Sequence, residues 1–187
     1  MTENKFHVIG NYFGVTIVCY ILLFAFYDQI LTHELPCPLC LLQRTAFVGI
    51  GLCAFMNIKE GIKPSHYGFM LLASLLGFMI ALRQIFLHIA PDDPGYGPVF
   101  FGLHYYVWSA ISFVFAVGFI GIALLLERGF IPKARPIGKP TYALGIILLG
   151  LILANGISTV LECGLMVCPD NPVKYDVLSE HKTSSLG

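Results

Sequence analysis

Five long apolar stretches constrain the fold of this chain more than any other feature. They cover residues 8–31, 40–58, 67–89, 105–126 and 141–161. A helix needs about 20 apolar residues to cross the roughly 30 Å of hydrocarbon in a bilayer. Only 12% of the residues are charged, which is about half the share that is usual in soluble domains. The sequence therefore predicts an all-α integral membrane protein, folded as a bundle of five transmembrane helices.

The segments that connect these stretches are short, so we expect one membrane domain over residues 1–187 with a polar tail at 162–187. The first stretch is longer than the apolar core of a signal peptide and lacks a small-residue cleavage site, which predicts a retained helix. Residues 90–104 are rich in proline, glycine and aromatic residues. This composition argues against a continuous helix there and suits the membrane interface.

The distribution of basic residues predicts the orientation in the membrane. Five spans place the two ends of the chain on opposite sides. One side carries two basic residues, both in the tail, and the other carries seven, which are Lys5, Lys59, Lys63, Arg128, Lys133, Arg135 and Lys139. The side with seven is expected to be cytoplasmic, so the tail is expected to lie on the outer face. The net charge is zero, which gives no electrostatic basis for nucleic acid as a partner.

Two cysteines, Cys37 and Cys40, lie where a polar turn meets the second stretch. Thiols at this spacing can close a small disulfide ring, which accepts two electrons. A helix N-terminus favours the thiolate, and Arg44 places a cation one turn past Cys40 on the same face. A structural disulfide and a metal half-site are the alternatives, but zinc needs further ligands, and no second CxxC or histidine pair lies nearby. We therefore predict a redox-active Cys37–Cys40 disulfide and no metal.

A second close pair, Cys163 and Cys168, follows the fifth stretch. Gly164 permits a turn that would allow a Cys163–Cys168 disulfide. This pair is either a staple for the tail or a second redox pair that exchanges with the first through thiolate attack. The predicted orientation places both pairs on the outer face, where disulfides persist. The remaining cysteines, Cys19 and Cys53, lie in the middle of apolar stretches and are expected to be inert packing residues.

Two polar residues near the outer end of the third stretch remain as candidates. Arg83 is expected to pair with Asp28 or with lipid phosphate, or to serve as a ligand-binding residue. His88 is either a hydrogen-bonded structural histidine or the proton donor that a reduced acceptor needs, because the pKa of histidine suits that role.

Over about residues 8–126 the chain resembles the DsbB family, disulfide bond formation proteins of bacterial inner membranes. The resemblance rests on Cys37-Pro38-Leu39-Cys40 at the start of the second stretch and on Gln43-Arg44 just inside it. It implies a DsbB-like four-helix core, to which this chain adds a fifth transmembrane helix. The best-known members carry their second cysteine pair between the third and fourth spans. Residues 90–104 contain no cysteine here, and we expect Cys163 and Cys168 to have taken over that role.

The resemblance also implies an enzyme, a protein-disulfide:quinone oxidoreductase that reoxidises a periplasmic thioredoxin-fold dithiol oxidase, DsbA-like in kind. Electrons would pass through Cys163 and Cys168 to Cys37 and Cys40, and then to membrane ubiquinone or menaquinone. The residues expected to bind the quinone are Arg44, Gln43 and His88. The alternatives are a vitamin K epoxide reductase-like oxidoreductase, whose CxxC lies late in its bundle, and a non-enzymatic membrane protein whose cysteines bind metal.

Overall fold

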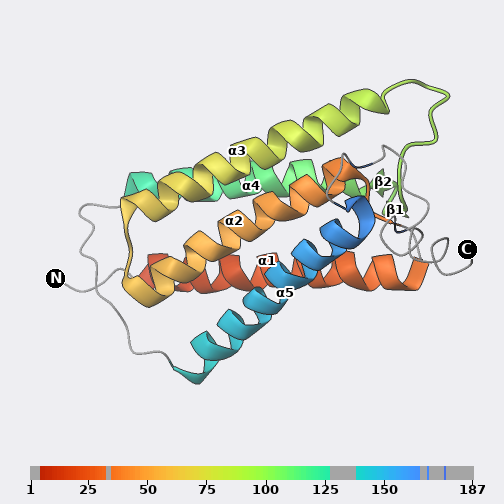
Figure 1. Ribbon diagram of the computed structural model, residues 1–187. Helices are drawn as coiled ribbons and strands as arrows, with labels where there is room; N and C mark the ends of the chain where they lie inside the picture. The colour runs from red at the N-terminus through yellow and green to blue at the C-terminus, as the bar shows by residue number, and fades with distance from the viewer. Residues whose placement is uncertain (1–4, 33–34, 127–137, 165–167, 169–174, 176–187) are drawn as a thin grey trace, which may run out of the picture.

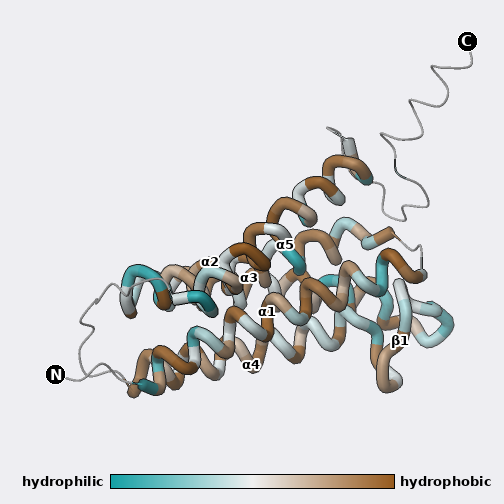
Figure 2. Tube along the Cα trace, turned by 90° about the horizontal axis from the view of Figure 1, so that it is seen from below, coloured by the Kyte–Doolittle hydropathy of each residue, from teal (hydrophilic) through white to brown (hydrophobic). Residues whose placement is uncertain are grey.

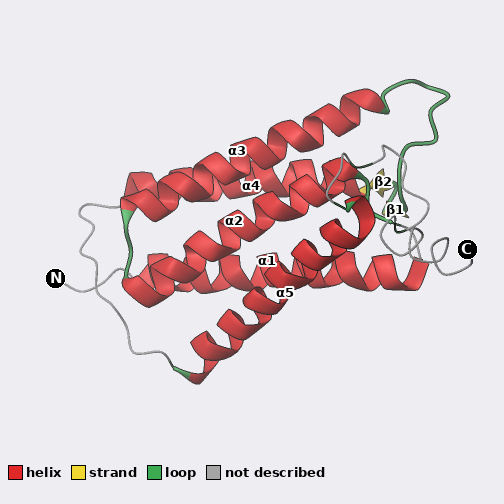
Figure 3. Ribbon diagram, in the orientation of Figure 1, coloured by secondary structure: helices red, strands yellow, loops and turns green. Residues whose placement is uncertain are grey.

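The predicted helix bundle is confirmed in a computed structural model, which describes residues 5–32, 35–126, 138–164, 168 and 175. Within these ranges five helices are long and apolar enough to cross a membrane. They are α1 (Lys5–Thr32), α2 (Pro38–Glu60), α3 (Pro64–Leu87), α4 (Tyr105–Leu126) and α5 (Lys139–Cys163), as Figures 1 and 3 show. A proline in the first turn of α2, α3 and α5 helps to fix where each begins, since the missing N–H has no helical partner at that position.

Helix α2 is the centre of the bundle, with contacts to α1, α3 and α5. Helix α4 packs on α3, and α5 lies obliquely across α1 and α2 (Figure 1). Many large apolar side chains point outward, among them Phe115, which is 75% exposed. Hydrophilic residues gather at the helix ends and in the loop around β1 (Figure 2). An outward apolar surface with polar ends is what a lipid environment requires.

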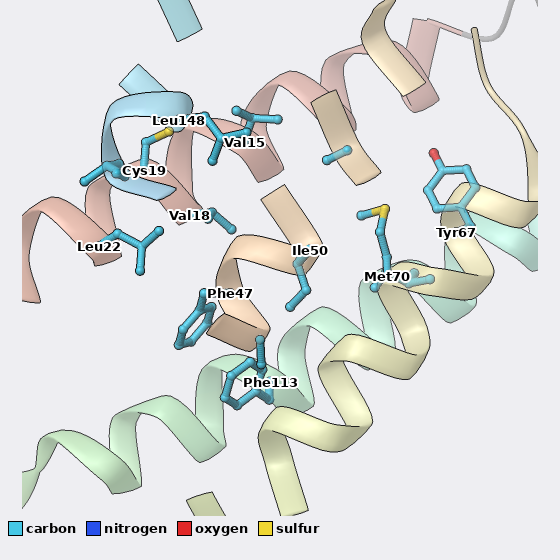
Figure 4. Close-up of a cluster of buried hydrophobic side chains, with 14 of the residues drawn as sticks. Val15, Val18, Cys19, Leu22, Phe47, Ile50, Tyr67, Met70, Phe113 and Leu148 are labelled. Carbon is cyan, nitrogen blue, oxygen red and sulfur yellow. The ribbon is translucent and has the colours of Figure 1, made fainter. Parts of the chain in front are cut away.

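The core between α2, α3 and α4 is built around two stacked rings. Phe47 and Phe113 have ring centroids 4.2 Å apart and nearly parallel planes, and both are buried (Figure 4). Gly77 of α3 makes this packing possible, because a Cβ at that position would lie 2.4 Å from the Phe113 ring. The stacked pair therefore fixes how closely α3 and α4 approach each other beside α2.

The segment between α3 and α4 contains a small hairpin, which the sequence did not predict. Strands β1 (Val99–Phe100) and β2 (Leu103–His104) are antiparallel. The two turn residues, Phe101 and Gly102, have φ values of 50° and 79°, as the tight turns of two-residue hairpins require. Phe101 is 84% exposed, and the Trp108 indole N–H donates to the Phe100 carbonyl 2.9 Å away. The aromatic tip of this hairpin therefore lies at the end of the bundle that holds the start of α2.

A buried polar network joins the opposite end of the first three helices. The Asn11 amide donates to the Tyr67 hydroxyl at 2.8 Å, and the Asn57 amide donates to the Asn11 side-chain oxygen at 3.0 Å. His66 Nδ1 lies 2.9 Å from Asn57 Oδ1, and His7 Nδ1 lies 3.0 Å from the Tyr67 hydroxyl. These mutual hydrogen bonds satisfy polar groups that would be costly in an apolar interior.

Candidate redox site

The first cysteine pair caps the N-terminus of α2. Cys37 is the N-cap residue, and its Sγ accepts a hydrogen bond from the backbone N–H of Cys40 at 3.2 Å. Cys37 is buried and Cys40 is half-buried. Both are free cysteines in this structure, so the predicted Cys37–Cys40 disulfide is not formed here, and the geometry is that of the reduced pair. The Cys40 N–H of the first turn points toward the Cys37 sulfur, and a helix N-terminus is the position that favours a thiolate.

Gln84 of α3 contacts both sulfurs, and the sequence analysis missed it. Its Nε2 lies 3.2 Å from Cys37 Sγ and 3.5 Å from Cys40 Sγ. Its Oε1 accepts a hydrogen bond from Gln43 Nε2 at 2.8 Å. Both glutamines are buried, Gln84 with 1% of its surface exposed and Gln43 with 3%. The available signal was an amide in an otherwise apolar helix, where a polar side chain needs a partner.

The two sulfurs of the reduced pair differ in their tendency to ionise. The hydrogen bond with the Cys40 side chain raises the pKa of the Cys37 thiol, and burial raises it further. Because the two sulfurs share one environment, a charge on one opposes a charge on the other. The reduced pair is therefore best described as a Cys37 thiol beside a Cys40 thiolate.

Arg44 lies one turn beyond Cys40 and is held by α1. Its Nη1 donates to Gln29 Oε1 at 2.7 Å, and its Nη2 donates to the Ala25 carbonyl at 3.2 Å. The guanidinium carbon lies 5.0 Å from the centre of the Phe26 ring. The charge of Arg44 interacts most strongly with Cys40 and more weakly with Glu162 of α5. The cation is thus fixed near the thiolate by hydrogen bonds to another helix rather than by direct bonds to sulfur.

Two neighbouring cavities lie beside this site. The first, of about 110 Å³, is lined by Cys40, Gln43 and Arg44 together with residues of α1, the outer loop and α4. The second, of about 440 Å³, is almost wholly apolar and is lined mainly by α1 and α4, together with Phe47 and Ile50 of α2 and Met70 of α3. Ile21 and Phe47 line both cavities. The small chamber beside Cys40 and the larger apolar groove therefore share part of their lining.

His88 does not line either cavity. Its Nδ1 lies 3.0 Å from Asp93 Oδ1, and its ring stacks on Tyr106 at 5.8 Å. Tyr106 does line the chamber beside Cys40. The backbone N–H of Gly95, followed by the His88 side chain, holds the pKa of Asp93 below its usual value. His88 is thus one residue removed from the cavity that it was expected to reach directly.

The second cysteine pair lies at the C-terminal end of α5 and is joined by a disulfide, Cys163–Cys168. Gly164 follows the helix with φ of 61°, which provides the turn that the sequence predicts. Residues 165–167 lie outside the described residues. Cys163 is buried. The pair therefore begins within the packed end of the bundle.

Hydrogen bonds connect α5 to the helices of the first pair. Gln29 Nε2, whose amide oxygen binds Arg44, lies 3.2 Å from Ser158 Oγ and 3.3 Å from the Tyr175 hydroxyl. Asn155 Nδ2 lies 3.4 Å from the hydroxyl of Thr45. The fifth helix is thereby tied to α1 and α2 beside Arg44.

Comparison with known proteins identifies the family. A "Disulfide bond formation protein B" of Chromobacterium violaceum is 31% identical over 144 residues, which are 71% of this chain and 83% of that protein. The chain belongs to the DsbB family. The family model "Disulfide bond formation protein DsbB" matches residues 10–97. DsbB proteins of Marinobacter nauticus and Nitrosomonas eutropha are 40% and 37% identical, over 45% and 37% of this chain and 54% and 45% of their own lengths. No solved structure matches.

Membership of the DsbB family makes this chain a multi-pass membrane protein of disulfide bond formation, and it decides against the vitamin K epoxide reductase-like lineage. The DsbB match at residues 10–97 includes the first cysteine pair, Arg44 and Gln84. It ends before α4 and does not reach Cys163 or Cys168. The fifth helix and its cysteine pair are thus outside the segment that the DsbB model describes.

Proposed function

We propose that this protein is a quinone-dependent thiol oxidase that reoxidises a periplasmic dithiol oxidase of thioredoxin fold. The observation that carries the proposal is the cavity lined by Cys40 and Arg44, which shares Ile21 and Phe47 with the larger apolar groove. A DsbA-like protein is the partner, and the reaction is that of a protein-disulfide:quinone oxidoreductase in the bacterial inner membrane.

The residues present suit a membrane quinone. A quinone supplies an acceptor for two electrons and two protons. Arg44 and the Gln43 amide line the chamber that would hold its ring, and apolar side chains of α1 and α4 line the groove that would hold its isoprenoid tail. Cys40, as the cysteine that lines the chamber, faces the quinone. His88 acts on the quinone through Tyr106, on which its ring stacks, rather than by contacting the quinone itself.

The chain's own cysteines carry the electrons in two exchanges. The partner's two thiols lose two electrons and two protons and become a disulfide, while the Cys163–Cys168 bond opens to two thiols. These thiols then reduce a Cys37–Cys40 disulfide, and the Cys163–Cys168 bond re-forms. The reduced first pair finally closes again as two electrons and the Cys37 proton pass to the acceptor, whose second proton comes from water. A closed second pair beside a reduced first pair corresponds to the stage after the second exchange.

The distribution of charge supports the orientation that this relay needs. The seven basic residues named above and the two in the tail support an orientation with the N-terminus in the cytoplasm and the tail in the periplasm. Both cysteine pairs then face the compartment in which disulfides persist.

The test is quinol formation by the purified protein. Protein with all four outer cysteines intact is mixed with a reduced DsbA-like protein and either ubiquinone or menaquinone, and quinol is followed by its absorbance. We expect quinol and oxidised partner in equal amounts, since each exchange moves two electrons. Absence of quinol with both quinones contradicts the proposal. Labelling of the tail with a membrane-impermeant thiol reagent, after reduction, tests the orientation independently.

A further inference from the structure

Gln84 is buried against the reactive sulfurs on the side away from the solvent. Its amide nitrogen lies 3.2 Å from Cys37 Sγ and 3.5 Å from Cys40 Sγ, and 1% of the residue is exposed. It does not line the cavity that holds Cys40 and Arg44. A side chain in this position reaches the sulfurs without reaching an acceptor in the cavity.

Gln43 determines which end of the Gln84 amide faces the cysteines. The Gln43 amide nitrogen donates to Gln84 Oε1 at 2.8 Å, and this oxygen lies 3.8 Å from Cys40 Sγ, farther than the Gln84 NH₂ group at 3.5 Å. The bond from Gln43 thus favours the orientation in which the NH₂ group is the closer of the two to the sulfurs. An amide NH₂ carries two protons, so one group can donate to both sulfurs. Gln43 and Gln84 thus form a chain of donors that ends on the cysteines.

Arg44 cannot replace this contact. Its two terminal nitrogens donate hydrogen bonds to α1: Nη1 to Gln29 Oε1 and Nη2 to the Ala25 carbonyl. The guanidinium therefore acts on the thiolate through its charge, whereas Gln84 acts through direct hydrogen bonds. Hydrogen bonds to a charged acceptor are stronger than those to a neutral one, so Gln84 discriminates between a thiolate and a neutral sulfur.

We propose that Gln84 is a catalytic residue whose amide stabilises the reduced Cys37–Cys40 pair and thereby makes its disulfide a stronger oxidant, with Gln43 as the residue that positions it. This inference deepens the proposed function and rests on the first pair being redox-active. On oxidation the pair loses two electrons and the proton of Cys37, and a neutral S–S bond forms. The two electrons and this proton go to the quinone, the second proton of the quinol comes from water because Cys40 had already released its own, and the amide is left facing two weak acceptors. Gln84 therefore favours the reduced form over the disulfide.

The experiment compares two Gln84 variants with a matched control. Gln84→Met keeps the length of the side chain but has no donor, and Gln84→Glu keeps its shape but replaces the donor with a carboxylate. Asn155→Leu is the control, because it removes a buried amide that contacts Thr45 and no sulfur. Helical circular dichroism and thermal melting establish that each variant is folded.

Two readouts follow the cysteines rather than overall activity. The first is the rate at which iodoacetamide modifies reduced Cys40 at pH 7, measured by peptide mass spectrometry. The second is the equilibrium of the first pair with a glutathione redox buffer. Loss of a charge-assisted hydrogen bond predicts alkylation about fivefold slower or more in both Gln84 variants. It also predicts an equilibrium about tenfold further toward the disulfide, which is about 30 mV.

Gln43→Met should give a smaller change in the same direction, because the Gln84 donor remains but its orientation is no longer fixed. The inference is overturned if folded Gln84→Met matches the wild type within twofold in both readouts, or if Asn155→Leu changes them equally. If Gln84→Met does not fold, the same criterion applies to Gln84→Glu. Both readouts use only glutathione and alkylating reagent, so they stand whether or not the wild type forms quinol, and the two proposals can fail separately.

Discussion

The first cysteine pair lies at the N-terminus of one helix and the second at the C-terminus of another, so the helix dipoles act on the two pairs with opposite sign. Cys37 and Cys40 lie at the N-terminus of α2, beside the Gln84 amide and near the Arg44 charge. Cys163 is the last residue of α5 and follows Glu162, which is fully buried. A helix N-terminus stabilises a negative charge and a C-terminus disfavours one. The first pair is therefore suited to hold a thiolate, and the second is better suited to remain a disulfide.

This contrast agrees with the proposed direction of transfer. Electrons that arrive at the second pair generate thiolates where the helix end does not stabilise them, and the first pair offers a site that does. The same contrast predicts that the two pairs respond differently to substitution and to pH.

The largest expected effect is loss of the Cys40 sulfur. Cys40→Ser should reduce quinol formation by more than about a thousandfold, because no thiolate remains beside the cavity. Quinol absorbance measures the effect with either a protein or a small dithiol as reductant. Cys53→Ala is the control, since Cys53 packs against the core in the middle of α2, and it should match the wild type within twofold. Substantial turnover by Cys40→Ser would mean that the first pair is not the donor to quinone.

The next effect separates a relay from a staple at the second pair. Replacement of both Cys163 and Cys168 by serine should reduce turnover with the protein dithiol by about a hundredfold or more, by analogy with the loss of an essential exchange partner. Turnover with dithiothreitol should change little, because a small thiol can reach the first pair directly. Equal turnover with the protein dithiol before and after substitution would assign this disulfide a purely structural role.

A smaller effect is expected when the planar fork of Arg44 is lost. Arg44→Lys keeps the charge but cannot bind Gln29 Oε1 and the Ala25 carbonyl in the same geometry. The KM for quinone should rise about tenfold, with a smaller change in kcat. Arg83→Lys is the matched control, because Arg83 is exposed and lines neither cavity. If both variants raise the KM equally, the effect is not specific to the site.

The smallest effect is expected from acid pH. It should change only the contacts of the loop beside the first cysteine pair. Asp93 binds the Gly95 N–H and His88, and the same loop carries Tyr96, whose hydroxyl donates to the Leu35 carbonyl at 2.6 Å. The pKa of Asp93 is below its usual value, so its contacts are complete above about pH 4 and are lost as the pH falls through the lowered value.

Trp108 is the one tryptophan of the chain and binds the hairpin at the end of this loop. Its fluorescence should be constant from pH 7 to pH 5 and change below about pH 4. Asp93→Asn should show the acid spectrum already at pH 7. A spectrum of Asp93→Asn that equals the wild type at both pH values would show that these contacts do not hold the loop.

The sequence was sufficient to predict the features that depend on local pattern. The apolar stretches predicted the helices, and the position of Cys40 at the start of the second stretch predicted that it lies at a helix N-terminus. The role of Gln84 depends on how α3 packs against α2, which the order of residues does not specify. A weaker signal was present, since Gly77, Ala81 and Gln84 lie on one face of α3 and all three are buried. Small residues on one face of a membrane helix indicate close packing, and an amide on that face indicates a buried contact.

The hairpin and the state of the first pair were beyond the sequence for different reasons. Prolines and glycines in residues 90–104 excluded a helix there, but a pair of two-residue strands is too short to leave an alternating pattern. The spacing of Cys37 and Cys40 permits both a disulfide and two thiols, and which of them is present depends on the electron balance rather than on the fold.

The polar network at the other end of the bundle has a consequence for how the protein is made. Its side chains, His7, Asn11, Asn57, His66 and Tyr67, all come from the first 67 residues. Synthesis proceeds from the N-terminus, so these hydrogen bonds can form while α4 and α5 are still being translated. In hydrocarbon each unpaired polar group costs several kcal/mol, which favours early pairing. The helix that carries the first cysteine pair can thus be bonded to α1 and α3 before the ribosome has synthesised the second cysteine pair.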